Sequence, residues 1–275
     1  MMSSSDVKIF AVFGNPIGHS LSPLMHQAAL DRLGLKARYV PFCVKDIGKA
    51  VEGIRSLDIQ GVSVTLPFKT EVMKYLDEVE ENAIRIGAVN TIWNHQGRLM
   101  GYNTDWLGFV LSLKEGLEIR GKRFAVLGAG GAARGVVYGL IQEGGLPIIL
   151  NRTLSKAEAL GEEFGCPFFP LSEKKKIEAD CLINTTSLGM APEQGMSPFP
   201  KGLLNRFSWV VDIIYNPLQT KLLKEAAEAG CQTLSGLGMF VHQGAEQLKI
   251  WTCQEPPRDY MKEVVASKLK EYGRN

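Results

Sequence analysis

The length and composition of the chain exclude several classes of function. Its 275 residues are enough for two compact domains or one large one, and a composition of 45% hydrophobic and 22% charged residues shows no sign of disorder. A formal net charge of +2 gives no excess of positive charge for nucleic acid backbones, and the lysine run 174–176 is expected to be a solvated helix face. No apolar stretch reaches the ~20 residues that a membrane span needs. We therefore expect neither a nucleic acid partner nor a membrane partner.

Cysteines and histidines indicate the compartment and argue against a metal. The five cysteines are scattered and contain no C-x-x-C spacing, so we expect free thiols in a reducing compartment. The first residues have no basic region followed by an apolar run, so we expect a cytoplasmic protein. None of the four histidines has a zinc-binding spacing such as H-E-x-x-H, and we expect no metal site. These histidines are His19, His26, His95 and His242.

Short apolar strands alternate with helical stretches in the first hundred residues. Pro23 suits the first turn of a helix, and Gly34 suits its end. The predicted elements are, in chain order, a strand at 7–13, a helix at 23–33, a strand at 37–43, a helix at 46–56, a strand at 61–65, helices from Phe68 and from Glu78, and a strand at 88–93.

The same alternation continues in a second region. Its predicted elements are a helix at 105–116, a strand at 122–127, a glycine-rich turn with a helix to about Gly144, strands at 147–150, 179–183 and 209–213, and helices from Met239 and Pro257. Alternation of this kind is typical of parallel sheets covered by helices on both faces. We therefore predict two α/β domains, an N-terminal one with a mostly parallel open sheet and a Rossmann-type one, joined by a hinge at 102–106.

The sharpest local motif is a glycine-rich turn directly after the strand that ends at Leu127. It has the G-x-G-x-x-A pattern of a dinucleotide-binding turn, in the required strand–turn–helix setting. The residues are Gly128, Ala129, Gly130, Gly131, Ala132 and Ala133. Gly128 permits the tight turn, Gly130 lets the backbone approach a pyrophosphate, and the helix N-terminus favours the negative charge of phosphates.

The end of the next strand indicates which dinucleotide binds. NAD sites usually have Asp or Glu there, whereas this chain has Asn151, Arg152 and Thr153, with Lys156 following. Arg152 can bind a 2′-phosphate with two hydrogen bonds, and Lys156 adds a second positive charge. The alternative is a solvated arginine at a strand end. We predict NADP as the cofactor.

Four polar segments outside this motif each follow or end a predicted strand, where ligands collect in open α/β sheets. They supply hydroxyls, an amide, one amine and one carboxylate, which suit a small polyhydroxylated acid. The segments are 14–23 (GNPIGHSLSP), 64–69 (VTLPFK), 87–91 (GAVNT) and 101–105 (GYNTD).

With these motifs in this order, the chain resembles the shikimate dehydrogenase family over essentially its whole length. The resemblance implies reversible NADPH-dependent reduction of 3-dehydroshikimate to shikimate in chorismate and aromatic amino acid biosynthesis. It implies Lys69 and Asp105 as the catalytic pair, with Ser20 and Ser22 binding the substrate carboxylate. The other substrate contacts that it implies are Thr65, Asn90, Tyr215 and Gln243.

The resemblance extends the cofactor site and sets the domain boundaries. It adds Ile213 and Gly236 near the nicotinamide and, more weakly, Glu81. It implies that the last helices return to the first domain, so that residues 1–104 with 241–275 bind substrate and 105–240 bind NADP. Those last helices could instead form an oligomer surface and make the chain a homodimer, but we favour packing on the first domain.

The chemistry of the proposed pair follows from its residue types. Hydride addition to a ketone develops negative charge on oxygen, which an ammonium group such as that of Lys69 stabilises or protonates. Two alternatives stay open: a quinate/shikimate dehydrogenase with broader substrate range and NAD use, and a non-catalytic nucleotide sensor. A sensor would have no need for the Lys69 and Asp105 pair.

Overall fold

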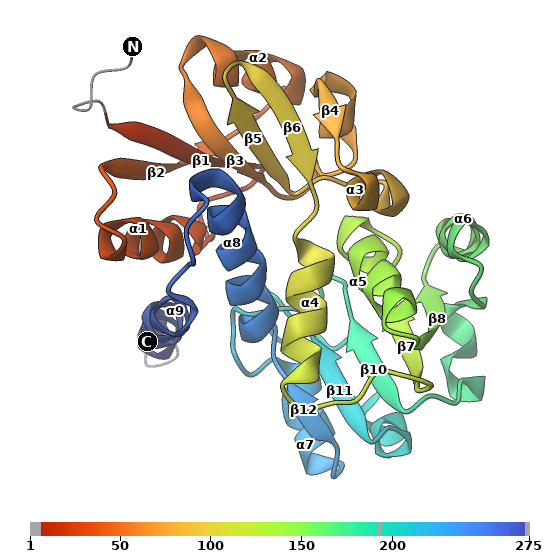
Figure 1. Ribbon diagram of the computed structural model, residues 1–275. Helices are drawn as coiled ribbons and strands as arrows, with labels where there is room; N and C mark the ends of the chain where they lie inside the picture. Colours follow the sequence, from red (N-terminus) through yellow and green to blue (C-terminus); the bar gives the residue numbers. More distant parts are fainter. Residues whose placement is uncertain (1–6, 192–193, 273–275) are drawn as a thin grey trace. The chain divides into compact units, whose positions relative to one another are not determined.

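The computed structural model describes residues 7–191 and 194–272, and these form two compact units (Figure 1). The first unit comprises the described residues up to Thr104 together with Val241–Lys268, and the second comprises Asp105–Phe240 and the described residues from Leu269. One boundary therefore lies between Thr104 and Asp105, and another lies inside a helix. The expected division into 1–104 with 241–275 and 105–240 differs from this grouping only from Leu269 onward.

The first unit is built on a six-stranded, mostly parallel sheet in the order β2-β1-β3-β5-β6-β4. The pairs β1–β2, β1–β3 and β4–β6 are parallel, whereas β3–β5 and β5–β6 are antiparallel. The strands are β1 (Lys8–Gly14), β2 (Ala37–Cys43), β3 (Ile59–Val64), β4 (Glu78–Val79), β5 (Thr91–His95) and β6 (Arg98–Tyr102).

Helices cover both faces of this sheet, which explains why strands such as β1 read as unbroken apolar runs. The helices are α1 (Ser22–Arg32), α2 (Ile47–Ser56), the 3₁₀ helix η1 (Glu71–Tyr75), α3 (Glu81–Ile86), α8 (Leu237–Thr252) and α9 (Arg258–Tyr272). On one face Ala11 and Phe13 of β1 pack in a core with α2. On the other face Phe10 stacks on Trp251 of α8, with ring centroids 5.3 Å apart. Figure 1 shows α2 on one side of the strands and α1 with α8 on the other.

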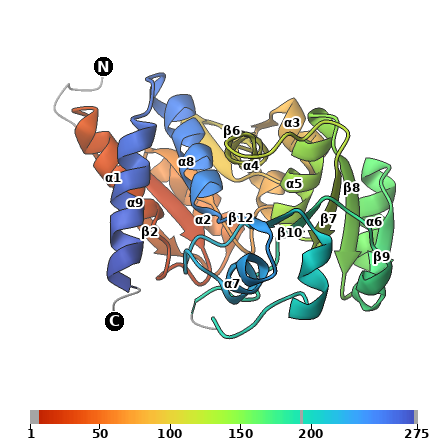
Figure 2. The same ribbon diagram turned by 90° about the horizontal axis from the view of Figure 1, so that it is seen from below.

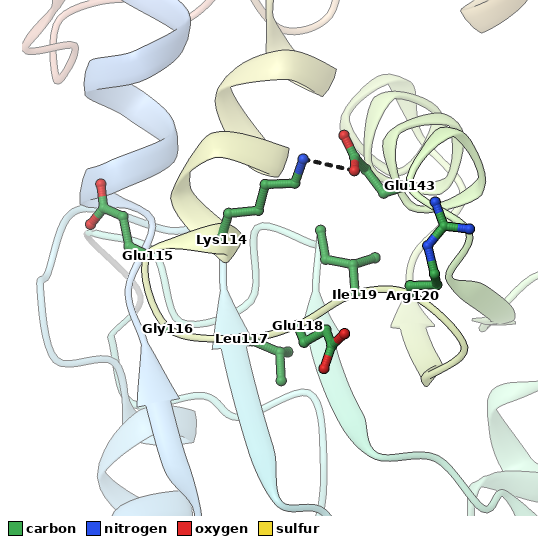
Figure 3. A pocket seen from close by; sticks show the side chains of 8 residues that line it. All are labelled: Lys114, Glu115, Gly116, Leu117, Glu118, Ile119, Arg120 and Glu143. Atoms are coloured by element: carbon green, nitrogen blue, oxygen red, sulfur yellow. Dashed lines mark ion pairs between the residues drawn. The ribbon is translucent and has the colours of Figure 1, made fainter.

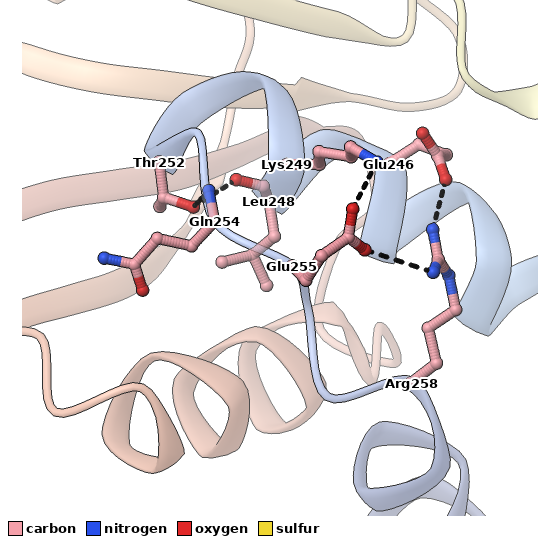
Figure 4. A network of polar contacts seen from close by, with 7 residues as sticks. All are labelled: Glu246, Leu248, Lys249, Thr252, Gln254, Glu255 and Arg258. Carbon is pink, nitrogen blue, oxygen red and sulfur yellow. Dashed lines mark hydrogen bonds and ion pairs between the residues drawn. The ribbon is translucent and has the colours of Figure 1, made fainter.

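Ion pairs fix the connection between α8 and α9 (Figure 4). Arg258 at the start of α9 lies 2.5 Å from Glu246 of α8 and 3.6 Å from Glu255 in the connecting loop. Lys249 of α8 pairs with the same Glu255. These contacts anchor the C-terminal half of α8, the helix that presents Gln243 and Gln247 to the first sheet.

The second unit is a doubly wound α/β fold. All its neighbouring strands are parallel, in the order β12-β11-β10-β7-β8-β9. Counted from β7, this is the 3-2-1-4-5-6 order of a Rossmann sheet. The strands are β7 (Arg123–Leu127), β8 (Leu146–Asn151), β9 (Phe168–Pro170), β10 (Cys181–Asn184), β11 (Trp209–Asp212) and β12 (Gln232–Leu234).

Two cores lie on the two faces of this sheet. Helices α4 and α5 bury residues such as Phe109 and Val137 on one face, and α7 buries Leu222 and Leu223 on the other (Figure 2). The helices of the unit are α4 (Asp105–Lys114), α5 (Gly131–Gln142), α6 (Leu154–Phe164), η2 (Leu171–Lys176), η3 (Lys201–Arg206) and α7 (Lys221–Glu228). The predicted pair of α/β domains is confirmed.

Several predicted elements were wrong in detail. The helix expected from Phe68 is a turn followed by η1, and the one expected from Glu78 is the short strand β4 followed by α3. Helix α3 begins later because the Glu80 carboxylate accepts a hydrogen bond from the Ala83 N–H and caps it. The elements that the sequence reading missed are β6, α6, β9, η3, α7 and β12. None of the helices formed by the described residues has a long enough apolar run to cross a membrane.

Candidate active site

Two of the four predicted substrate segments meet at the carboxyl ends of β1 and β3. The Asn15 N–H donates to the Leu66 carbonyl oxygen at 3.0 Å, and the Thr65 N–H donates to Phe13 at 2.9 Å. A Cβ added at Gly14 would lie 2.5 Å from Thr65 Cγ2, so only glycine allows this approach. Thr65 itself is half-buried. The close approach forms one wall of a polar cluster in the first unit.

The two predicted carboxylate-binding serines lie where this first loop enters α1. Ser20 is half-buried, and Ser22, the first residue of α1, is buried. The Ser22 N–H donates to Ser20 Oγ at 3.2 Å. Pro23 occupies the first turn of the helix, as predicted. A helix N-terminus with adjacent hydroxyls is a favourable place for an anion.

The third and fourth segments join the same cluster. The Val89 N–H donates to the Lys69 carbonyl oxygen at 2.7 Å, and the Asn90 N–H donates to Tyr102 at 3.0 Å. The Asn103 amide donates to the Ala88 carbonyl oxygen at 2.8 Å. Lys69 is half-buried in the turn before η1. The main chain of Lys69 is thus fixed beside the Asn90 segment.

A buried amide network surrounds Asn90, which is 1% exposed. Its Oδ1 accepts from the Thr104 N–H at 2.8 Å, and its Nδ2 donates to Thr104 Oγ1 at 2.9 Å. The same Nδ2 lies 3.4 Å from Gln243 Oε1 on α8. The structure therefore brings together two residues, Asn90 and Gln243, that are 153 positions apart and were both predicted to bind substrate.

Asp105 and Tyr215, two further predicted site residues, belong to the second unit. Asp105 is the first residue of α4 and is 4% exposed. Tyr215 is half-buried and stacks on Phe240, with ring centroids 4.0 Å apart. Gly236 and Ile213 lie beside it in the fold: a Cβ added at Gly236 would lie 2.0 Å from the Ile213 carbonyl oxygen.

The glycine-rich turn lies at the position that the Rossmann fold uses for dinucleotides. The strand order reverses between β7 and β10, and Gly128 follows β7 at the carboxyl edge of the sheet. Gly128 has φ +113°, and a Cβ there would lie 2.6 Å from Thr185 Oγ1. Gly130 to Ala132 open α5 and are not buried. The exposed backbone of this turn fits a pyrophosphate that must approach the main chain closely.

The predicted phosphate-binding side chains follow β8 at the same edge. Asn151 Nδ2 donates to the Thr153 carbonyl oxygen at 2.9 Å and closes the turn into α6. Arg152, Thr153 and Lys156 are exposed. Within the described part of the chain, Arg152 and Lys156 have no ion-pair partner, whereas Arg134 in α5 is paired with Glu163. The positively charged side chains of Arg152 and Lys156 are thus available for a 2′-phosphate, and the site fits NADP.

Glu81, a weaker cofactor prediction, belongs to the other unit of the fold. It lies in the first unit, at the start of α3, and its carboxylate is 2.5 Å from Arg85. This salt bridge joins two residues one turn apart on the same helix, and it explains the position of the Glu81 side chain without a bound cofactor. We retain it only as a prediction from the family resemblance.

Comparison with known proteins identifies the family. Residues 12–92 match the shikimate dehydrogenase substrate binding domain, and residues 236–266 match the shikimate 5′-dehydrogenase C-terminal domain. The NADP⁺ shikimate dehydrogenase of Geobacillus kaustophilus is 47% identical over 96% of this chain and 99% of its own. The chain belongs to the shikimate dehydrogenase family.

Other members of the shikimate dehydrogenase family agree over the full length. The NADP⁺ shikimate dehydrogenase of Pyrococcus furiosus is 44% identical over 98% of this chain and 99% of its own. A Thermus thermophilus shikimate 5-dehydrogenase, solved with NADP(H) and shikimate, is 38% identical and superposes with a TM-score of 0.87 over 95% of this chain and 99% of its own. The family resemblance inferred from the motifs is confirmed.

Thr185 and Thr186 in the second unit were missed by the sequence reading. They follow β10 and lie against Gly128 at the switch point, and the Thr185 hydroxyl donates to the Leu127 carbonyl oxygen at 2.6 Å. The available signal was a polar run, Asn-Thr-Thr-Ser, directly after an apolar strand. Both residues therefore adjoin the glycine-rich turn of the candidate cofactor site.

A hollow elsewhere in the second unit lies outside this site. Its volume is about 490 Å³, and it lies before β7, at the edge of the sheet opposite the glycine-rich turn. Lys114 and Glu143 pair across it at 2.7 Å (Figure 3). No predicted site residue lines it. Among the described residues there is also no group of three or more side chains placed to hold a metal ion.

Proposed function

We propose that this chain catalyses the reversible NADPH-dependent reduction of 3-dehydroshikimate to shikimate, a step of chorismate and aromatic amino acid biosynthesis. The observation that supports this most strongly is the polar cluster of the first unit. Main-chain hydrogen bonds link four segments that carry hydroxyl, amide and ammonium groups, in a chain that is 47% identical to a named NADP⁺ shikimate dehydrogenase. Such groups suit an acid with several hydroxyls and offer no aromatic surface for a nucleobase.

Each part of the cluster has a role in this proposal. Ser20 and Ser22 bind the substrate carboxylate beside the N-terminus of α1, and Thr65 and Asn90 bind ring hydroxyls. Gln243 and Tyr215 make further substrate contacts. Buried side-chain hydrogen bonds hold the Asn90 amide, and main-chain hydrogen bonds hold the loop of Thr65, so these two residues need little ordering when the substrate binds.

Lys69 and Asp105 are proposed to act at the reacting carbonyl. NADPH, when bound, supplies the hydride that adds to the carbonyl carbon. The Lys69 ammonium stabilises the negative charge that develops on the carbonyl oxygen and can donate its proton. Asp105 orients Lys69 by charge and accepts a hydrogen bond from a substrate hydroxyl.

The cofactor is held by the second unit in this proposal. Gly128–Ala132, Thr185 and Thr186 surround the pyrophosphate, while Asn151, Arg152, Thr153 and Lys156 hold the 2′-phosphate end. Ile213 and Gly236 lie near the nicotinamide, with Glu81 as a weaker assignment. The five free thiols fit the reducing conditions of the cytoplasm, where we place the enzyme.

One assay tests the proposal against its alternatives. The formation of reduced nicotinamide is followed by absorbance with shikimate or quinate, each with NADP⁺ or NAD⁺. We expect the highest kcat/KM for shikimate with NADP⁺. Comparable rates on quinate with NAD⁺ would identify the broader quinate/shikimate enzyme, and cofactor binding without turnover would identify a nucleotide sensor. Sedimentation velocity on the same preparation separates a monomer from a homodimer.

A further inference from the structure

Asn184, the last residue of β10, is an amide to which none of the roles above assigns a part. It is fully buried. Its Oδ1 accepts two hydrogen bonds from Thr186, one from the N–H at 3.0 Å and one from the hydroxyl at 2.7 Å. Its Nδ2 donates to Asp212 Oδ1 at the end of β11, 3.0 Å away, and lies 3.4 Å from the Leu188 carbonyl oxygen. A single side chain therefore joins the loop after β10 to the end of the neighbouring strand.

Thr186 is held in place by this amide. The preceding residue, Thr185, is held by β7, because its N–H and its hydroxyl both donate to the Leu127 carbonyl oxygen, at 3.0 and 2.6 Å. The N–H and the hydroxyl of Thr186 instead both donate to Asn184. A Cβ added at Gly128 would lie 3.3 Å from Thr186 Cγ2, so Thr186 lies against the glycine-rich turn. Asn184 thus fixes a residue beside the proposed pyrophosphate site.

The other end of the amide holds the loop at the proposed nicotinamide end of the site. Asp212 Oδ1, which accepts from Asn184, also accepts from the Ile214 N–H at 3.1 Å. The Ile214 carbonyl oxygen in turn accepts from the Gly236 N–H at 3.0 Å. The ladder between the two strands ends with the Ile213 N–H, which donates to the Asn184 carbonyl oxygen at 3.1 Å. Past that point the side chains of Asn184 and Asp212 continue the connection.

An amide is the side chain that suits this position. A main-chain bond farther out, from the Ala191 N–H to the Asn216 carbonyl oxygen, joins the same two loops but does not involve Thr186. The buried position needs an acceptor toward Thr186 and a donor toward Asp212 at once. Leucine has neither group, and aspartate would place a second carboxylate beside the first, where like charges repel.

We propose that Asn184 is a positioning residue that holds Thr186 against the glycine-rich turn and ties that loop, through Asp212, to the loop after β11. The pyrophosphate and nicotinamide parts of NADP are thereby bound by one connected pair of loops. The 2′-phosphate end, at Arg152 after β8, does not depend on this connection. The inference rests on the proposed function, because it concerns the cofactor site of that enzyme.

The test compares two ligands that share the 2′-phosphate end of the cofactor. NADP⁺ occupies the whole proposed site, whereas adenosine 2′-monophosphate has neither the pyrophosphate nor the nicotinamide. Asn184→Leu keeps the size of the side chain and removes its hydrogen bonds. In isothermal titration calorimetry it should raise the Kd for NADP⁺ about tenfold and leave the Kd for adenosine 2′-monophosphate within about twofold. An unchanged Kd for NADP⁺, or an equal rise for both ligands, would overturn the proposal.

Two control variants change the same network without breaking this link. Thr220→Val removes the 2.8 Å hydrogen bond to the other oxygen of Asp212, so it should lower the Tm and keep the wild-type Kd for NADP⁺. Asp212→Asn keeps the acceptor for Asn184 and should also keep that Kd. A Kd raised as much by Thr220→Val as by Asn184→Leu would overturn a specific role for Asn184. If Asn184→Leu does not fold, Asn184→Asp takes its place, and the Kd for NADP⁺ alone should rise.

A readout without cofactor separates this inference from the proposed function. Exchange of the main-chain amide hydrogens is measured by ¹H–¹⁵N NMR in the full chain. In Asn184→Leu the Thr186 N–H should exchange faster relative to that of Thr185, whose bond to Leu127 is unchanged. Equal protection of Thr186 in both proteins would overturn the inference. A wild-type chain that shows the expected exchange and binds NADP⁺ but does not oxidise shikimate would instead overturn the proposed function.

Discussion

The carboxylate of Asp212 accepts a hydrogen bond of 2.8 Å from the hydroxyl of Thr220, in the interior of the second unit. Its other oxygen accepts from the Asn184 amide at 3.0 Å and from the Ile214 N–H at 3.1 Å. Asp212 is fully buried. Burial raises the pKa of its carboxyl to about 6, although all three hydrogen bonds oppose the rise. A buried group at the end of β11 thus fixes the loop that contains Ile213 and Tyr215.

Asp212→Asn should stabilise the protein at neutral pH. The pKa rises from 3.8 in the unfolded chain to about 6 in the folded one, so folding favours the protonated form. The wild type therefore loses stability as the pH rises from about 4 to about 6, by about 3 kcal/mol from this group. Asparagine keeps the acceptor for Asn184 and Ile214 and can donate to Thr220 Oγ1, so the variant should lack this loss.

Urea unfolding of both proteins between pH 4 and pH 8 measures the difference. The stability of the variant relative to wild type should rise through this range and then level off. Asp58→Asn, at an exposed position in the first unit, is the control and should follow the wild-type curve. Parallel curves for Asp212→Asn and wild type would show that the buried carboxyl does not titrate differently on folding.

Gly236→Ala should disrupt the nicotinamide end of the cofactor site. The added Cβ would lie 2.0 Å from the Ile213 carbonyl oxygen, and a main-chain atom cannot move away as a side chain can. Overpacking of this kind typically costs about 1–3 kcal/mol or more. Gly202→Ala is the control, because its Cβ would meet nothing within 4 Å. Thermal unfolding should show a lower Tm for Gly236→Ala alone, and equal Tm values would mean that the loop adjusts without cost.

The parts of the site that could be predicted from sequence are those that depend on residues close together in the chain or on the shared edge of a parallel sheet. The turn at Gly128 follows its strand directly, and parallel strands deliver their carboxyl ends to one edge, so the Gly14 and Thr65 loops could be expected to meet. Gln247 could not be found this way, because its partners Ser63 and Asn90 are 184 and 157 positions distant. In sequence it reads only as a polar residue within a long helix.

Errors in the predicted elements have a similar origin. The helix expected from Phe68 does not form because the main-chain carbonyl oxygen of Lys69 instead accepts a hydrogen bond from the Val89 N–H. No local sequence pattern predicts this contact. Strand β6 was missed because it forms only against β5 and β4. Helical or strand propensity is a weak guide where such pairing decides the outcome.

Arg152→Ala should weaken NADP binding far more than NAD binding. Arg152 is exposed after β8 and has no ion-pair partner among the described residues, so it is available to a 2′-phosphate. Loss of a bidentate charged contact is worth roughly 2–3 kcal/mol, or about 30- to 150-fold in the KM for NADP. Arg120→Ala, an exposed arginine at the opposite edge of the same sheet, is the control. Equal changes in KM for both cofactors would argue against a phosphate contact.

Lys69→Ala tests the proposed chemistry. If the Lys69 ammonium meets charge that grows on the carbonyl oxygen, its contribution belongs to the transition state, and kcat should fall at least ~100-fold. The KM for shikimate should stay within a few-fold, because the ground-state ketone or alcohol carries no such charge. Lys74→Ala, at an exposed lysine in η1 just after this turn, should leave both constants unchanged.

Further variants at the same centre separate proton donation from charge stabilisation. Lys69→His or Lys69→Asn can still donate a hydrogen bond, so part of kcat should return. Asp105→Asn should lower kcat and also raise the KM, since that buried carboxylate is proposed to bind a ring hydroxyl as well as to orient Lys69. Steady-state kinetics with shikimate and NADP⁺ across a pH series measures all four variants. A folded Lys69→Ala enzyme with near-normal kcat would contradict this mechanism and assign the proton transfer to Tyr215 or to a water molecule.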